Sequence, residues 1–409
     1  MQCGDRRPAT SRAARWVGAA LLCAVALPAA AAGPMLVAQP LTDDAIMDHP
    51  PRIEGRRVVW QSGDGNDAEI LLWDGLETRQ LSFNGLRDEA PAIDGPVVVW
   101  QQHDGNDFEL IRYHTEARTL SYLTNNEQED RFPVVASVFT AWLGDSFESE
   151  EIFLLPAPGQ VTGDTWEQDP PVISGPEGGL AWVLRSDAGT DVFAFLPQHP
   201  DLPGVYQISP FDNETTDERP VIWRNRIAWV QGSGSTEEIW RYDPAADFPY
   251  WQVTNDNLRD TDPVIAGNLI AWEHWDGNDW EIYTWEEGDV APSPLTNNAY
   301  DDVVLAVSGR TLVWIANGDG DYEIWRSWNL ETPEQLTDND VDDVDVVIDG
   351  DRLAWRQCDA SDCDVWTAPE PDTTATVGVA LAALAWLAHR SARNALARAE
   401  RADRTQVRQ

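Results

Sequence analysis

A single tryptophan recurs along most of this chain at a nearly constant spacing, and this spacing limits what the chain can fold into. Successive members of the series lie 40, 42, 40, 47, 43, 42 and 41 residues apart. Self-similarity at about 40–45 residues is typical of four-stranded propeller blades. The series therefore predicts eight repeated units, marked by Trp60, Trp100, Trp142, Trp182, Trp229, Trp272, Trp314 and Trp355.

The unit around Trp272 shows the four short strands that each repeat contains. Apolar runs at residues 263–265 and 269–272 precede an Asp-Gly-Asn-Asp turn, and two further runs follow it at residues 281–283 and 294–296. Short β-rich runs separated by Gly, Pro, Asn and Asp are strand signals, and no helical period competes with them outside the two chain ends. We predict an all-β fold, an eight-bladed β-propeller of four-stranded blades over residues 38–371.

The last unit is incomplete, which indicates how the ring closes. Residues 342–371 supply three strands and lack the Leu-Thr strand that ends the other units. Ahead of the first unit, residues 40–44 (Pro-Leu-Thr-Asp-Asp) are close in pattern to residues 335–339 (Gln-Leu-Thr-Asp-Asn). We expect this N-terminal strand to complete the last blade, because such a closure leaves no open seam in the ring.

Residues 1–32 have the pattern of a secretory signal peptide. Four arginines between Arg6 and Arg15 precede an apolar run over residues 16–32 that ends in Ala30, Ala31 and Ala32. A basic region, an apolar region and small residues for cleavage are the three parts of such a signal. The sequence therefore predicts export.

The C-terminal segment, residues 369–409, has the pattern of a second targeting signal. Pro369-Glu370-Pro371 precedes an apolar run over residues 376–388 and an Arg-rich end, and this order resembles the PEP-CTERM sorting signal. The resemblance implies a Gram-negative cell envelope and processing by an exosortase-type enzyme. The alternative is a plain membrane anchor with its arginines on the cytoplasmic side. In either case we expect membrane contact only through this segment.

The repeat itself resembles a known family. The pattern Pro-x-Ile-x-Gly, Val-x-Trp, Asp-Gly-Asn-x-Glu-Ile and Leu-Thr is similar to TolB-like β-propeller repeats of microbial cell-surface proteins, over residues 38–371. The resemblance implies the propeller fold and leaves the activity open, since propellers host many functions. TolB carries a further domain before its propeller, and no segment of that size precedes the first unit here, so we do not expect a role in the Tol system.

The charge of the chain excludes one class of partner. The sequence holds 70 acidic residues against 28 basic ones, all of them arginine, for a formal net charge of −42. A surface this negative repels phosphates and attracts cations. We therefore expect no nucleic-acid partner.

The acidic turns are the sharpest functional feature of the sequence. Carboxylate and amide oxygens gathered in a turn are hard ligands that suit Ca²⁺. The alternative, which we prefer, is turn chemistry, because Asp-Gly and Asn favour the positive φ of tight hairpins. The candidate calcium ligands are Asp64, Asp67, Asp104, Asp107, Asp276, Asp279, Asp319 and Asp321; no other cofactor is indicated.

Two cysteines remain after the two in the signal segment are set aside. Alignment of the repeats places Cys358 and Cys363 on either side of the middle turn of the last blade. An oxidising compartment permits them to form a disulfide. A metal site is the weaker alternative, because there is no second cysteine pair and no nearby histidine.

Catalytic signatures are missing from the sequence. It has no Gly-x-Ser-x-Gly elbow, no His-Glu-x-x-His and no Gly-rich phosphate loop. Prolyl-peptidase-type propellers need an attached hydrolase domain, for which we find no residues. The tryptophans that fall outside the repeat positions are candidate sugar platforms: Trp166, Trp223, Trp251, Trp275, Trp280 and Trp328.

We therefore expect a monomeric, exported surface or envelope protein that acts as a non-catalytic scaffold. Its expected partners are a polysaccharide or another surface protein. The alternative function is an extracellular polysaccharide lyase or hydrolase that uses carboxylates of the central channel.

Overall fold

The computed structural model describes residues 38–146, 149–156, 159–199, 203–209, 216–318 and 320–368. The predicted signal peptide (1–32) and sorting segment (369–409) lie outside these residues, and so does the candidate ligand Asp319. Among the described residues, no helix is both long and apolar enough to span a bilayer.

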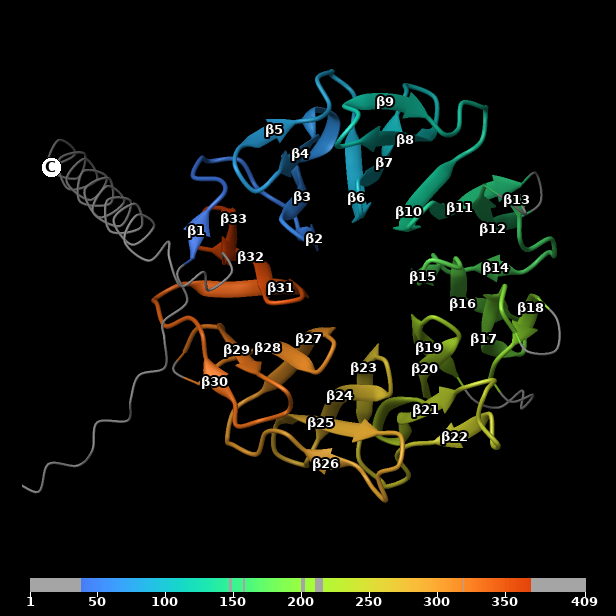
Figure 1. Ribbon diagram of the computed structural model, residues 1–409, viewed down its shortest axis with the longest axis vertical. Helices are drawn as coiled ribbons and strands as arrows, with labels where there is room; N and C mark the ends of the chain where they lie inside the picture. Colours follow the sequence, from blue (N-terminus) through green and yellow to red (C-terminus); the bar gives the residue numbers. More distant parts are fainter. Residues whose placement is uncertain are drawn as a thin grey trace, which may run out of the picture. The chain divides into compact units, whose positions relative to one another are not determined.

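Eight antiparallel sheets follow one another around a central axis, which confirms the predicted eight-bladed β-propeller (Figure 1). The first four blades contain the following strands, in chain order. Blade 1 has β2 (Arg52–Glu54), β3 (Arg57–Ser62), β4 (Glu69–Trp73) and β5 (Thr78–Gln80); blade 2 has β6 (Asp88–Asp94), β7 (Val97–His103), β8 (Phe108–His114) and β9 (Thr119–Tyr122); blade 3 has β10 (Asp130–Ala136), β11 (Phe139–Ser146), β12 (Ser149–Leu155) and β13 (Gly159–Gln160); blade 4 has β14 (Glu167–Gln168), β15 (Val172–Ser174), β16 (Gly179–Ser186), β17 (Gly189–Leu196) and β18 (Gly204–Gln207).

The second half of the ring repeats this order. Blade 5 has β19 (Asp217–Trp223), β20 (Arg226–Gln231), β21 (Glu238–Tyr242) and β22 (Tyr250–Gln252); blade 6 has β23 (Asp260–Ala266), β24 (Leu269–Trp275), β25 (Trp280–Glu286) and β26 (Ser293–Pro294); blade 7 has β27 (Asp302–Ser308), β28 (Thr311–Ala316), β29 (Glu323–Ser327) and β30 (Glu334–Gln335); blade 8 has β31 (Asp342–Asp349), β32 (Arg352–Cys358), β33 (Cys363–Ala368) and β1 (Gln39–Pro40). Two single 3₁₀ turns, η1 (Gly65–Asp67) and η2 (Gly234–Thr236), interrupt the strands.

The N-terminal strand completes blade 8, as the sequence predicts. β1 pairs with β33, with Gln39 opposite Thr367 and Pro40 opposite Trp366. The Leu41 backbone N–H donates to Val365 O at 2.7 Å, and the Val365 N–H donates to Thr42 Oγ1 at 2.8 Å. The first and last described segments of the chain are thus hydrogen-bonded within one sheet.

The core of the ring lies between neighbouring blades. The repeated tryptophans stand on the second strand of each blade, and seven of the eight are almost completely buried. Seven of the eight lie in clusters with residues of the preceding blade. Trp272, for example, packs in a cluster that contains Val230 and Ile239 of blade 5, and Trp100 in one that contains Val59 and Ile70 of blade 1. Apolar area removed from water is the main stabilising contribution, so these tryptophans hold consecutive blades together.

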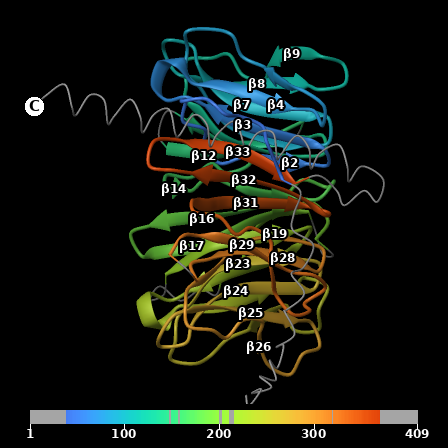
Figure 2. The ribbon, with the colours of Figure 1, turned by 90° about the vertical axis from the view of Figure 1, so that its left-hand side faces the viewer.

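In side view the strands run roughly along the axis of the ring, so that hairpin turns gather at its two faces (Figure 2). Because the strands are antiparallel, the turns between the second and third strands share one face with the loops that lead into the next blade. We call this the turn face; it carries all the acidic turns.

Candidate functional site

Each repeated tryptophan donates its indole N–H to a polar side chain at the beginning of the same blade. Trp100 Nε1 donates to Asp88 Oδ1 at 2.6 Å and Trp272 Nε1 to Asp260 Oδ1 at 2.6 Å. In seven blades the acceptor is an aspartate twelve residues before the tryptophan, and in blade 4 it is Gln168. Our sequence analysis missed these acceptors, although the constant twelve-residue spacing was visible: Asp48, Asp88, Asp130, Asp217, Asp260, Asp302 and Asp343.

Burial raises the pKa of several of these aspartates. The pKa of Asp217 rises to about 6 and that of Asp302 to about 7, in each case chiefly because burial disfavours the charged carboxylate. The hydrogen bond from the tryptophan opposes the shift but does not cancel it.

A loop asparagine connects consecutive blades on the turn face. The Asn126 side chain donates to Asp130 Oδ2 at 2.8 Å, and the Asn126 backbone N–H donates to a carboxylate oxygen of Glu109 in the preceding blade. The same pattern links Glu281, Asn298 and Asp302 between blades 6 and 7. These contacts bring the carboxylates of one blade close to those of the next.

In blades 2 and 6 the acidic turns behave in part as hairpin chemistry predicts. Asp104 Oδ1 accepts the backbone N–H groups of Asn106 at 2.8 Å and Asp107 at 3.3 Å. These two bonds lower the pKa of Asp104, and the same arrangement lowers the pKa of Asp276. The first aspartate of each turn therefore stabilises the hairpin.

The last aspartate of these two turns has a different environment. Asp107 and Asp279 are only 4% and 5% exposed, and neither oxygen of either carboxylate meets a hydrogen-bond donor. Each lies with the first aspartate and a third-strand glutamate in a group whose ligand atoms are within 4.8 Å of one another. The glutamates, Glu109 and Glu281, were not among our candidates, although each follows its turn by two residues.

The turns of blades 1 and 7 form no such group among the described residues. In blade 1, Gly63 adopts φ +87°, so the chain leaves the hairpin one residue earlier and enters η1. Asp67 is then exposed, and Asp64 pairs with His49 Nε2 at 2.9 Å. In blade 7, Gly318 occupies the place of Asp104, and Asp321 is not brought together with two other acidic ligands.

A third group contains a histidine. Asp256, Asp260 and His274 line a cavity of ≈ 270 Å³, and His274 Nδ1 lies 2.7 Å from Asp260 Oδ1. Burial works to lower the pKa of His274, but the hydrogen bond and charge of Asp260 outweigh it, so the net shift is upward. In blades 2, 5 and 8 a glutamine occupies the position of His274 and donates to the equivalent aspartate of its own blade. His274 therefore has a structural role, as a hydrogen-bond partner of the buried aspartate.

The structure contains the disulfide between Cys358 and Cys363, whose Cα atoms are 4.1 Å apart. The two residues face each other at the end of β32 and the beginning of β33. The bond closes the hairpin that leads to the N-terminal strand.

A pocket near the axis lies on the turn face at the beginnings of β2, β6 and β10. It has a volume of ≈ 350 Å³ and is lined by side chains of both charges together with amides and apolar groups. Phe132 stands at its edge, 43% exposed. We call it the inner pocket; its lining includes His49, Arg52, Gln61, Asp64, Arg87, Glu89, Gln101 and Phe132.

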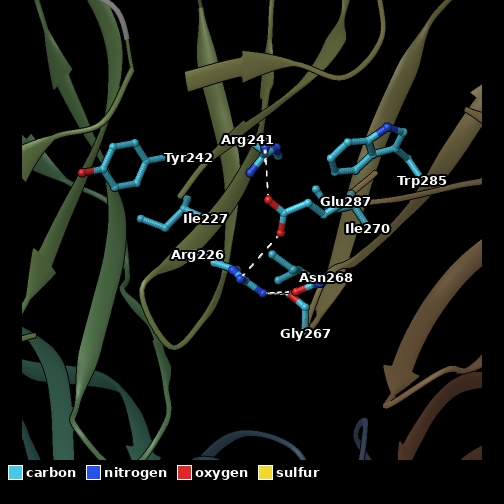
Figure 3. A pocket seen from close by; sticks show the side chains of 10 residues that line it. Arg226, Ile227, Arg241, Tyr242, Gly267, Asn268, Ile270, Trp285 and Glu287 are labelled. Atoms are coloured by element: carbon cyan, nitrogen blue, oxygen red, sulfur yellow. Dashed lines mark hydrogen bonds and ion pairs between the residues drawn. The ribbon is translucent and has the colours of Figure 1, made fainter. Parts of the chain in front are cut away.

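A second depression, between blades 5 and 6, is filled by its own side chains (Figure 3). Glu287 lies between two arginines, 3.7 Å from Arg226 and 4.0 Å from Arg241, and Arg241 stacks 5.2 Å over Trp285. Only ≈ 10 Å³ of space remains there. This ion pair network joins two blades and leaves no room for a ligand larger than water.

The candidate sugar platforms do not gather into one surface. Trp166, Trp251 and Trp328 are exposed, but they belong to loops or edges of different blades. Trp275 and Trp280 contact each other edge to face across one hairpin, with ring centroids 5.5 Å apart.

No protein-family model matches the sequence, and a search of curated proteins finds no relative. Solved structures share the fold. A structure from an analysis of two prolyl endopeptidases matches with TM-score 0.53 and 12% identity, over 77% of this chain and 55% of that chain. A puromycin-hydrolyzing peptidase of Mycobacterium tuberculosis matches with TM-score 0.51 and 12% identity, over 80% and 60%. The computationally designed protein Ika8 matches with TM-score 0.51 and 14% identity, over 82% and 99%.

The comparisons correct the function that we expected. A non-catalytic scaffold for polysaccharide or a surface protein is the wrong expectation, because the two natural proteins compared above are peptidases. The chain spans 55% and 60% of the length of these peptidases, so the likeness concerns the propeller and is one of fold.

Proposed function

We propose that this propeller binds peptides at the inner pocket and presents them to a peptide-hydrolysing domain or chain. Two peptidases whose chains include a similar fold support the substrate class. The observation that carries the proposal is the inner pocket itself, where an exposed aromatic ring stands beside charged groups and amides.

The backbone holds Phe132 in place at the pocket. The register of β10 shifts between Arg131 and Val134, and Phe132 takes the left-handed conformation with φ +53°. Such a conformation costs about 1–2 kcal/mol for a residue with a side chain. The neighbouring blade stabilises it, because Gln101 Oε1 accepts the Phe132 backbone N–H at 2.8 Å. A bulge of this kind re-aims a side chain, here toward the pocket.

The lining of the pocket suits a peptide. Phe132 and Pro91 offer apolar contact, Gln61 offers an amide for a peptide backbone, and the Glu89 carboxylate, which also pairs with Arg87, attracts a cationic side chain. A volume of ≈ 350 Å³ falls within the range of small-ligand sites. The net charge of −42 attracts cationic peptides over long distances and raises their association rate at low salt.

Fluorescence anisotropy with labelled peptides tests the proposal. We expect the full chain to bind peptides that combine Arg or Lys with an apolar residue, and to bind acidic peptides more weakly. Phe132→Ala should weaken binding about tenfold or more, whereas Phe248→Ala, which removes another exposed phenylalanine (74% exposed) on a loop of blade 5, should leave it unchanged. Equal binding by both variants, or no peptide binding, would contradict the proposal.

We propose further that the repeats are of the TolB-like type and that the chain is exported, with the C-terminal segment acting as a PEP-CTERM-type signal for an exosortase-type enzyme. The disulfide between Cys358 and Cys363 supports an oxidising compartment. Mass spectrometry of the mature protein should find no peptide from residues 1–32. Full recovery of those residues in the mature protein would contradict export by this route.

A further inference from the structure

The two groups of acidic side chains in blades 2 and 6 are built alike. Each contains an exposed aspartate at the beginning of the turn, a buried aspartate at its end and a buried glutamate on the third strand. In each group the ligand atoms lie within 4.8 Å of one another. Ca²⁺ binds oxygens at about 2.3–2.6 Å, so two ligand oxygens on opposite sides of one ion are about 4.6–5.2 Å apart.

Both groups lack the partners that buried carboxylates need. Asp107 and Asp279 have no hydrogen bond to either oxygen, and one oxygen each of Glu109 and Glu281 is also buried without a partner. An unpaired buried charge is costly unless it is neutralised or binds a cation.

The arginines that stack on the aromatic residues of these two turns pair with other carboxylates. Arg87 stacks over Phe108 at 5.6 Å and pairs with Glu89. At the equivalent place in blade 6, Arg259 stacks over Trp280 at 5.4 Å and donates to Glu237 at 2.8 Å. In both blades the aromatic residue lies between the buried aspartate and the glutamate in sequence, and the arginine charge is directed to another carboxylate.

We propose that Asp104, Asp107 and Glu109 bind one divalent cation, and that Asp276, Asp279 and Glu281 bind a second. An all-oxygen ligand set favours a hard ion, and the flexible geometry of a turn suits Ca²⁺ better than the strict octahedron of Mg²⁺. The two sites stand on opposite sides of the ring, with three blades between them in either direction (Figure 1).

The sites stabilise two seams between blades. Glu109 also accepts the backbone N–H of Asn126, whose side chain donates to Asp130 in blade 3. The Phe108 backbone N–H donates to Glu129 Oε2 at 3.2 Å. In blade 6 the Trp280 backbone N–H donates in the same way to Asp301 Oδ1 at 3.0 Å. A cation on the glutamate therefore fixes a chain of contacts that extends into the next blade.

Equilibrium dialysis of the EDTA-treated full chain against Ca²⁺ tests the number of sites. In Mg²⁺-free buffer with saturating Ca²⁺, we expect the wild type to bind two ions per chain. Asp107→Asn and Asp279→Asn should each bind one ion, and the double variant should bind none. Asp67→Asn is the matched control, because it removes the equivalent but exposed aspartate of blade 1. The ion retained at the unmutated site shows that each single variant is folded.

Terbium luminescence distinguishes the two sites, because Trp280 adjoins only the blade 6 group. Excitation of tryptophan should sensitise bound Tb³⁺, and Asp279→Asn should abolish more of this signal than Asp107→Asn. A stoichiometry that does not change in either variant, or that falls equally in Asp67→Asn, would overturn the proposal and indicate a diffuse counterion atmosphere. These readouts do not depend on peptide binding, so this proposal and the proposed function can fail separately.

Discussion

Trp229 Nε1 donates a hydrogen bond of 2.9 Å to Oδ1 of Asp217, twelve residues earlier in the chain. Both side chains are fully buried, and Gln231 Nε2 donates to the same oxygen at 3.0 Å. The tryptophan thus serves two purposes, since its ring packs against blade 4 and its N–H holds the beginning of its own blade. This pairing recurs around the ring and explains why tryptophan, rather than another large apolar residue, marks each unit.

Replacing Trp229 with Phe should destabilise the protein by about 2–4 kcal/mol. The change removes a hydrogen-bond donor to a buried carboxylate and leaves a cavity at the position of the indole ring. Urea unfolding of the full chain measures the difference. Trp251→Phe is the control, because Trp251 is 50% exposed and its replacement should alter the free energy of unfolding by less than about 0.5 kcal/mol. Equal effects would contradict the role assigned to the Trp229–Asp217 pair.

The raised pKa of Asp217 predicts a pH dependence. Burial raises this pKa from 3.8 to about 6 in the folded protein, so the folded state holds a proton that the unfolded state has released. Its contribution to stability is therefore present below pH 3.8 and is lost as the pH rises through about 6.

Asp217→Asn keeps the acceptor oxygen and removes the titration. The variant should gain stability relative to the wild type as the pH is raised from 4 to 8, by roughly 2–3 kcal/mol. Unfolding measured across this range gives the difference. A constant difference between the two proteins would mean that Asp217 does not titrate as described.

The closure of the ring predicts an effect of Thr42. Thr42→Val keeps the shape of the side chain but removes the acceptor of the Val365 backbone N–H, which should cost about 1–3 kcal/mol. Thr119→Val, on the exposed outer strand β9, is the matched control. If thermal unfolding shows no difference between the two variants, the N-terminal strand does not close blade 8.

The disulfide predicts sensitivity to reductant. It closes a loop with a sequence separation of 5, for which the chain-entropy treatment gives about 2 kcal/mol. The melting temperature of the wild type should fall in dithiothreitol, whereas that of the Cys358→Ser/Cys363→Ser double variant should not respond. A wild type that is indifferent to reductant would contradict this contribution.

The fold could be predicted from the sequence because its signals are repeated. The tryptophan spacing counts the blades, and the missing Leu-Thr strand after Trp366 shows that Pro40 must pair at the end of the chain. The Asp-Trp pairing could also have been found, since its spacing is constant.

The carboxylate groups could not be derived from the turn motif alone. Asp64-Gly65-Asn66-Asp67 and Asp104-Gly105-Asn106-Asp107 are the same four residue types, yet only the second group turns its last aspartate inward. The difference arises one residue before the motif, where Gly63 permits the positive φ that His103 does not adopt. The orientation of Phe132 likewise depends on a β-bulge, which recurs at the equivalent place in blades 2, 5, 6 and 8 and which our sequence analysis did not predict.

The most direct test of the account is photo-crosslinking of a cationic peptide, carrying a single photoreactive residue, to the full chain. Mass spectrometry of the products should place the crosslinks on the inner pocket, at Gln61, Glu89 or Phe132, and an excess of unlabelled peptide should abolish them. Crosslinks confined to the outer strands of the blades, or labelling that unlabelled peptide does not reduce, would contradict the proposal that this propeller binds peptides at its inner pocket.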